Sequence, residues 1–377
     1  MFTGTAGDAG DGGIGGRAFD LVFFFGSSAA AAFVGVGLLL HPAWTVPAWW
    51  LFTLLADGPH LFITATRTYL SPDDRRRLGL ALWLAPLWLL AGPLALAITK
   101  VTGSRGPWDL FLLFAAVWSY HHVIRQHHGV LAIWEHHAGA DRFEARASGI
   151  FLQGALWAMI VVYLVVSPAS RLTLGLPTLP GSGERAFVVA VLIGLGAATL
   201  VWLLAVVRHR RRTPARARSW RPIVFALGPV GAFSAFNLFV VGAHEPVLAR
   251  PPNAEQCFLA VTTVGGLVHS FQYLGIVLAT NRRRYQGRGR SALARLGRAP
   301  ILGYLAVTGA SLVGYGLLNG ARGVPGVAFF GLESDASRLF LGVYWGLFFM
   351  HYQLDQIIWH PSRDPALRVE LGLARSS

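Results

Sequence analysis

A dense group of ionisable side chains interrupts an otherwise apolar stretch around residue 120. The group is made up of His121, His122, Arg125, His127 and His128. Residues 110–118 before it are entirely apolar, which is typical of a membrane-spanning helix. Ionisable groups at membrane depth are costly and almost always face a bundle interior or a cavity. Because imidazole is the commonest protein ligand for transition metals, the pattern predicts a buried metal site.

The composition places this site in an integral membrane protein. Of the 377 residues, 54% are hydrophobic and only 13% are charged, whereas a soluble domain has roughly 25% charged residues. The net charge of +14 does not indicate nucleic-acid binding, because the arginines form short runs between apolar segments, as cytoplasmic loops do. The single cysteine, Cys257, argues against a disulfide framework and against a cysteine-based metal site.

We predict an all-α polytopic bundle of about ten transmembrane helices, since a span needs about 20 apolar residues. The expected spans are 19–40, 47–69, 78–99, 108–134, 149–167, 186–207, 222–243, 257–280, 300–319 and 337–359. A disordered Gly-rich tail over 1–18 precedes the transmembrane domain of 19–360, and a cytoplasmic tail over 361–377 follows it.

The loops alternate in arginine content along the chain. Arginines gather after the second, fourth, sixth and eighth segments and again in the C-terminal tail, and the intervening loops have fewer. By the positive-inside rule both termini are cytoplasmic. We expect an integral protein of the bacterial inner membrane.

The predicted topology gives the depth of each residue in the membrane, because each helical residue advances about 1.5 Å along the helix axis. His60, His121, His269 and His351 all lie in the cytoplasmic halves of their helices, at similar depth. Because the arginines and the segment lengths alone give this topology, the matched depth is independent evidence that these histidines meet.

Polar companions accompany the histidines at helical spacing. Asp57 precedes His60 by three residues, Tyr273 follows His269 by four, and Asp355 follows His351 by four. Residues three or four apart share a helix face. The intervening sequence Asp57-Gly58-Pro59-His60 is expected to break its helix, and broken helices at membrane depth are tolerated where they line a cavity.

The fourth segment offers more than one face. His121, Arg125 and His128 fall on one face, His122 is on a neighbouring stripe, and His127 points elsewhere. His121 and His128 are about 10 Å apart along the axis, which favours two metals, or one metal with a supporting histidine. Any single histidine could instead be a hydrogen-bonded core residue. The predicted ligands are His60, His121, His122, His128, His269, His351, Asp57 and Asp355, with Arg125 and Tyr273 as catalytic residues.

The paired histidines at 121–122 and 127–128 resemble the His-rich sites of membrane non-haem iron oxygenases. This class includes fatty-acid desaturases and hydroxylases, alkane monooxygenases and the Brp/Blh carotene oxygenases. The chain has neither the HxxxH nor the HxxHH box of the desaturases, because its two pairs are separated by four residues. Brp/Blh-type proteins hold iron with histidines inside the bundle. The resemblance implies iron chemistry on a lipophilic molecule and assigns no residue.

We therefore expect an oxidoreductase of the oxygenase, hydroxylase or desaturase type, with a non-haem iron site that holds two ions. Zinc or copper is also compatible with these ligands. The partners would be a lipophilic small-molecule substrate, membrane lipids and an external electron donor, with no nucleic acid. The alternatives are a bis-histidine haem protein for electron transfer and a proton or metal-ion transporter.

Overall fold

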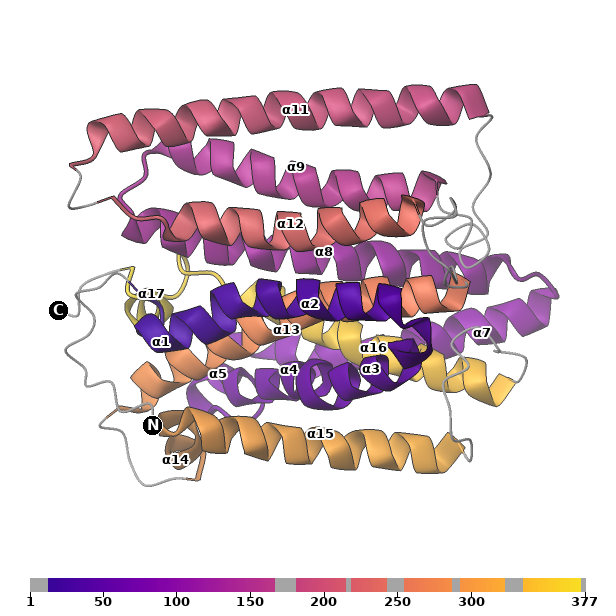
Figure 1. Ribbon diagram of the computed structural model, residues 1–377. Helices are drawn as coiled ribbons and strands as arrows, with labels where there is room; N and C mark the ends of the chain where they lie inside the picture. Colours follow the sequence, from indigo (N-terminus) through magenta and orange to yellow (C-terminus); the bar gives the residue numbers. More distant parts are fainter. Residues whose placement is uncertain are drawn as a thin grey trace. The chain divides into compact units, whose positions relative to one another are not determined.

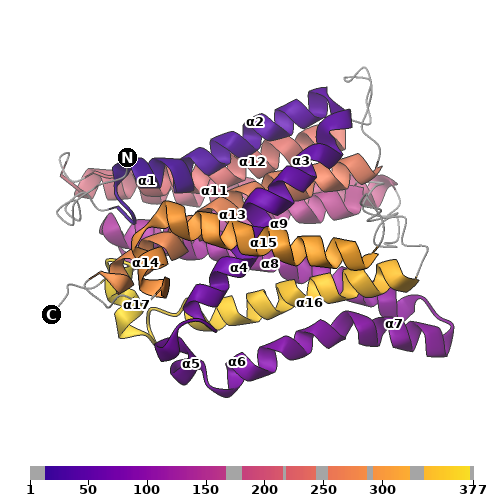
Figure 2. The same ribbon diagram turned by 90° about the horizontal axis from the view of Figure 1, so that it is seen from below.

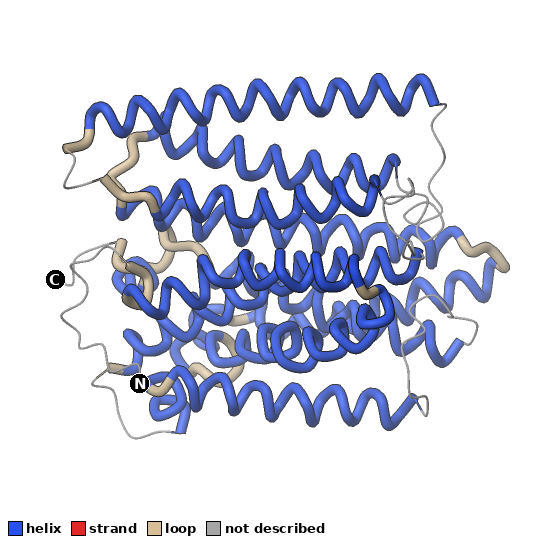
Figure 3. Tube along the Cα trace, in the orientation of Figure 1, coloured by secondary structure: helices blue, strands red, loops and turns tan. Residues whose placement is uncertain are grey.

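The computed structural model describes residues 13–166, 181–214, 218–242, 254–286, 292–322 and 335–373. These residues form helices joined by turns, and no strand occurs among them (Figure 3). The all-α expectation is confirmed for the described residues.

The chain divides into two compact units, each made from two separate stretches of sequence. The first unit combines Met1–Trp49 with Val123–Gln272, and the second combines Trp50–His122 with Tyr273–Ser377. The boundaries fall inside three helices, namely α3 (Thr45–Phe52), α8 (Gly106–His137) and α13 (Ala254–Tyr285).

The first unit is a set of long helices packed side by side. Besides parts of the three shared helices it contains α1 (Arg17–Asp20), the π-helix Leu21–Phe25, α2 (Gly26–Leu40), the short turn Pro42–Trp44, α9 (Arg142–Val166), α11 (Gly181–Arg212) and α12 (Arg221–Gly242). Helix α9 lies between α11 and α12, and α12 also packs against α2 (Figure 1). A Cβ at Gly228 would come within 2.8 Å of Ser28 Oγ, so this glycine permits the close approach of α12 to α2.

The N-terminal segment is more ordered than expected where it is described. Residues 1–12 of the predicted tail lie outside the described residues. Ile14 is fully buried, and the backbone N–H groups of Ile14 and Gly15 donate to the carboxylate of Asp20. The predicted tail therefore extends too far, because Asp20 anchors the residues before α1.

The second unit contains the helices that carry most of the predicted site. Its elements, besides parts of the shared helices, are the π-helix η4 (Thr53–Asp57), α4 (Gly58–Ile63), the 3-10 turn η5 (Thr64–Arg67), α5 (Pro72–Leu78), α6 (Leu80–Leu84), the 3-10 segment η6 (Ala85–Leu90), α7 (Ala91–Thr102), α14 (Ala292–Arg298), α15 (Pro300–Arg322), α16 (Asp335–Ile358) and α17 (Pro365–Glu370). Helix α16 runs along η6 and α7 (Figure 2), where a Cβ on Gly92 would clash with the Gly342 backbone. These glycines bring the two backbones together and so place His351.

The Asp57-Gly58-Pro59-His60 sequence changes the winding of its helix without interrupting it. The chain passes from α3 through the π-helix η4 into α4. Proline lacks an N–H and its ring clashes with the carbonyl four residues earlier, here that of Leu55. The Tyr304 hydroxyl donates to this Leu55 carbonyl at 2.7 Å, so α15 satisfies the group that Pro59 leaves behind. Single π-turns of this kind are frequent at functional sites.

Five helical stretches are long and apolar enough to cross a membrane among the described residues. They are Arg17–Leu40, Leu80–Thr102, Arg142–Val162, Gly181–Arg212 and Leu259–Tyr285. The pair Ala292–Arg298 and Pro300–Gly314, bent by 118°, would make a sixth. Helices α8 and α16 do not qualify, because their polar residues lower their hydropathy. A helical protein with apolar membrane-length helices is thus supported, and the count of ten spans with cytoplasmic termini stays a prediction.

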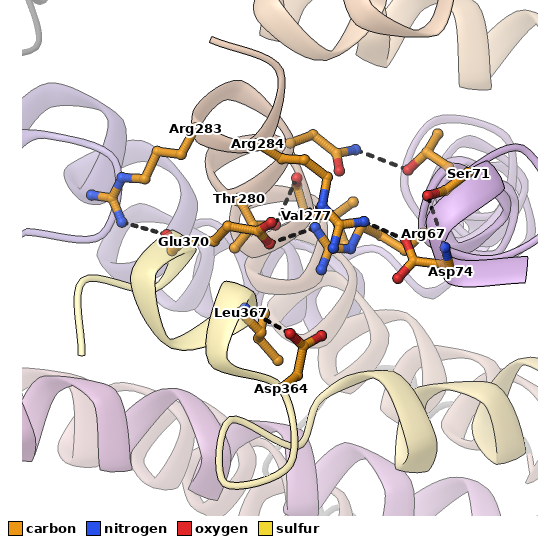
Figure 4. A network of polar contacts seen from close by, with 12 residues as sticks. Arg67, Ser71, Asp74, Val277, Thr280, Arg283, Arg284, Asp364, Leu367 and Glu370 are labelled. Atoms are coloured by element: carbon orange, nitrogen blue, oxygen red, sulfur yellow. Dashed lines mark hydrogen bonds and ion pairs between the residues drawn. The ribbon is translucent and has the colours of Figure 1, made fainter. Parts of the chain in front are cut away.

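A buried network of charges attaches α17 to the rest of the second unit (Figure 4). Glu370 of α17 accepts from Arg67 Nη1 and from Arg284 Nε, each at 2.7 Å, and Arg284 also pairs with Asp74 of α5. The Arg283 guanidinium donates to the Glu370 backbone carbonyl at 2.6 Å. Part of the predicted tail over 361–377 is therefore a docked helix, because buried charges require partners.

Candidate metal centre

Three histidines from three separate helices converge inside the second unit. The His60 and His351 rings lie edge to face with centroids 4.5 Å apart, and the His122 and His351 centroids are 5.1 Å apart. All three side chains are buried. They come from α4, α8 and α16, so the tertiary fold brings together positions that are far apart in the sequence.

A fourth histidine stands on α13, one helical turn before Tyr273. His60, His122, His269 and His351 form a buried group in which one ligand nitrogen from each lies within 4.8 Å of the others. Metal–nitrogen bonds of about 2.0–2.1 Å place four tetrahedral ligand atoms about 3.4 Å apart. Small inward movements of the rings would therefore let the group hold one metal ion.

A chain of hydrogen bonds orients the His351 ring. His351 Nδ1 lies 2.8 Å from Thr64 Oγ1, Thr64 Oγ1 lies 2.8 Å from the Tyr273 hydroxyl, and that hydroxyl donates to Asp355 Oδ1 at 2.5 Å. With Asp355 ionised, the Tyr273 proton points to the carboxylate, so the Thr64 proton must point to Tyr273. Thr64 then accepts from His351 Nδ1–H, which leaves the lone pair on Nε2.

His351 Nε2 has the properties of a metal ligand. It is buried and has no hydrogen-bond partner among the described residues. Metal-binding imidazoles usually donate their other N–H to an oxygen, which fixes the ring and raises its basicity. Thr64 supplies that oxygen here.

Asp355 lies beside the histidines with one oxygen directed at them. Its Oδ2 is 3.5 Å from His351 Nε2 and 3.7 Å from His122 Nε2. Separations of this size are common between atoms that share one ion. Asp57 is less close, since its Oδ1 is 3.8 Å from His60 Nδ1, which is too long for a hydrogen bond. Asp355 thus fits a ligand role, and Asp57 fits an outer electrostatic role.

The structure selects a different face of α8 from the expected one. His122 is 5% exposed and joins the group, whereas His121 and His128 are half-buried and do not belong to it. Arg125 is exposed, and the Asp355 carboxylate accepts a hydrogen bond from Tyr273. The sequence analysis favoured the face of His121, Arg125 and His128, whereas the histidine group contains His122. Helical spacing gives angles between residues but does not give the rotation of the helix against its neighbours.

The packing of α8 contains a signal that would have corrected this choice. Trp108, Phe111 and Ala115 form its buried stripe, and His122 follows Ala115 by seven residues, on the same side. The apolar residues around the whole helix mask this stripe in the sequence. The small Ala115 is its clearest mark, because small residues favour helix contacts in membranes.

Sequence reasoning missed Thr64 and Arg67. Asp57, His60, Thr64 and Arg67 are spaced by three, four and three residues, and all four are buried. This spacing places them on one side of a continuous helical stretch. The expected helix break at Pro59 concealed the pattern.

His127, which was expected to point away from the other histidines of its helix, is fully buried in the first unit. Its Nδ1 lies 2.7 Å from Gln272 Oε1. The amide nitrogen of Gln272 donates to the Phe24 carbonyl at 3.5 Å, which directs the amide oxygen toward His127. This arrangement is that of a histidine hydrogen-bonded within the helix core.

Comparison with known protein families, with curated proteins and with solved structures finds no match for this chain. The functional argument therefore rests on the arrangement of the side chains.

Proposed function

We propose that the protein is an integral-membrane oxidoreductase that uses one non-haem iron ion on a lipophilic substrate. The ligands are His60, His122, His269 and His351, with Asp355 as a fifth. The observation that carries the proposal is the convergence of four buried imidazoles within 4.8 Å. Imidazole with carboxylate is a ligand set suited to iron that activates dioxygen.

The geometry favours one ion over the two expected from the sequence. The expectation of two ions came from the separation of His121 and His128, and neither belongs to the histidine group. The geometry of the histidine group also favours a non-haem ion over haem. Four ligand nitrogens gathered this closely leave no room for a porphyrin between two of them.

The surroundings suit a reaction on a lipophilic molecule. An aromatic and aliphatic cluster that includes Phe111, Phe348 and Tyr352 lies beside the histidines, and the Tyr352 ring stacks on His122 with centroids 4.3 Å apart. Such walls exclude water from reactive intermediates. The substrate would enter from the bilayer, and an external donor would supply electrons.

The test is metal analysis of the protein purified in detergent, combined with optical, Mössbauer and electron paramagnetic resonance spectra. We expect about one iron per chain and no Soret band. A haem spectrum, or purified folded protein that cannot be loaded with iron, would overturn the proposal.

Neighbouring residues on α8 provide a matched pair of variants. His122→Ala should lose the metal, because it removes a ligand, whereas His121→Ala should keep it. Both remove an imidazole from nearly the same depth of the same helix, so general damage to the helix would affect both. Equal metal content in the two variants would contradict the assignment of His122.

A further inference from the structure

Tyr273 stands between the histidine group and the end of α16. Its ring centroid is 4.6 Å from that of His60 and 5.3 Å from that of His351. On another side its ring lies 6.0 Å from Trp359, nearly perpendicular. Tyr273 is buried, whereas Trp359 is half-exposed at the beginning of the C-terminal segment. Aromatic rings thus lead from a partly exposed position to the proposed metal ligands.

The Tyr273 hydroxyl also has a proton acceptor in place. It donates to Asp355 Oδ1 at 2.5 Å, a short bond of the kind formed between a hydroxyl and a carboxylate. A buried phenol is hard to oxidise while its proton stays, because a charged radical cation would be left in an apolar setting. Transfer of the proton to Asp355 leaves a neutral radical instead.

We propose that Tyr273 is a redox-active tyrosine that passes electrons singly to the metal. This inference rests on the proposed function, since it needs a metal ion that changes oxidation state. In the first step one electron leaves the Tyr273 ring and reduces the oxidised metal ion by one unit, while the phenolic proton moves to Asp355 Oδ1. The products are a neutral tyrosyl radical and a protonated Asp355.

The second step restores the tyrosine. A one-electron donor protein of the flavin or iron–sulfur class gives an electron by way of Trp359, and Asp355 returns the proton to the phenolic oxygen. The net change is one electron from the donor to the metal, with no net movement of protons. The Arg67 guanidinium lies 5.6 Å from the Trp359 ring centroid, and its positive charge disfavours a tryptophan radical cation. The oxidising equivalent therefore rests on Tyr273.

The experiment uses full-length, iron-loaded protein that is reduced without oxygen, mixed with dioxygen and frozen rapidly for electron paramagnetic resonance. The wild type should give an organic radical whose spectrum narrows when the tyrosine rings are deuterated and stays unchanged when the tryptophans are. Tyr273→Phe should lose this signal and keep its iron.

Tyr352→Phe is the matched control. Tyr352 is also buried, and its ring stacks directly on His122, so a general effect of losing a phenol near the metal would appear in this variant too. We expect it to retain the radical. If Tyr273→Phe fails to fold, a wild type whose isotope series shows no tyrosine radical, or a radical that is lost in Tyr352→Phe, still overturns the proposal.

The outcomes separate the two proposals. Iron that is oxidised by dioxygen with no tyrosine radical, or a radical that persists in Tyr273→Phe, would overturn the role of Tyr273 and leave the iron site standing. Protein that cannot bind iron would overturn the proposed function itself.

Discussion

The charged network around Glu370 and the histidines His60, His122 and His351 lie in the same unit and are similarly buried, but their polar groups are arranged in opposite ways. In the network, the carboxylates of Asp74 and Glu370 are matched by the guanidinium groups of Arg67 and Arg284. In the histidine group, the nitrogens converge on one another and on Asp355.

This difference in charge pairing distinguishes a cluster that stabilises the fold from one that could bind a metal ion. Opposite charges that pair within a protein satisfy each other and need no ligand. Lone pairs that face one another repel and leave a place for a cation, and Thr64 holds the His351 ring in that orientation. Burial and polarity alone would not have distinguished the two clusters.

The largest expected effects come from comparing one variant in each cluster, Arg284→Ala and His351→Ala, by stability and by iron content. Arg284→Ala removes the cation that pairs with both Asp74 and Glu370 and should lower the free energy of unfolding by about 3–5 kcal/mol, with iron per folded chain unchanged. His351→Ala should do the reverse and abolish iron binding at a smaller cost in stability. Unfolding in mixed micelles and metal analysis measure the two effects. Loss of iron from folded Arg284→Ala protein would show that the clusters are not separate in function.

Thr64 provides the next test, because it acts on the metal through His351. Thr64→Val keeps the shape of the side chain but removes the acceptor for His351 Nδ1–H, and should weaken iron affinity about 10–100-fold. Thr64→Ser keeps the hydroxyl and should bind iron nearly as well as the wild type. Titration with ferrous iron under anaerobic conditions compares the three proteins. Equal affinity of the valine and serine variants would remove Thr64 from the site.

The network should respond to acid through Asp74. Burial by itself would raise the pKa of Asp74, but the nearby Arg67 and Arg284, with the hydrogen bonds from Ser71 and Arg284, hold this pKa below its ordinary value of 3.8. Since the pKa is lower in the folded protein than in the unfolded chain, Asp74 stabilises the fold above about pH 4, and this contribution is lost as the pH falls further.

Asp74→Asn should therefore lower stability near neutral pH and flatten its decline in acid. The neighbouring Asp73 is exposed, so Asp73→Asn should leave the profile close to that of the wild type. Unfolding measured from pH 7 to pH 3 compares them. An unchanged acid profile in Asp74→Asn would contradict the pairing.

The smallest expected effect concerns the helix that carries His60. Tyr304→Phe removes the hydrogen bond to the Leu55 carbonyl and should cost about 0.5–1.5 kcal/mol of stability. Iron affinity should change less than in Thr64→Val, because Tyr304 supports the helix rather than a ligand. Parallel unfolding and iron titrations measure both quantities. A larger loss of affinity than of stability would mean that the π-turn sets the position of the His60 ring.

Much of the candidate site followed from residue types and helical spacing. His60, His122, His269 and His351 were all among the predicted ligands, and the structure brings one nitrogen from each of these four histidines together. The helices themselves were predictable, because long apolar segments bounded by arginines can satisfy their backbone only as helices in lipid. Thr64 was missed although it lies four residues after His60, since a break in the helix was expected at Pro59.

The sequence by itself determined an all-helical protein with apolar segments of membrane length and histidines on several of them. Only the tertiary structure decided that His122 and not His121 enters the group, and that Asp355 accepts a hydrogen bond from Tyr273. The physical reason is that periodicity sets the angle between residues on one helix, whereas the rotation of that helix depends on the packing of its neighbours. Stripes such as Trp108, Phe111 and Ala115 set that rotation, and they are hidden in a helix that is apolar on every side.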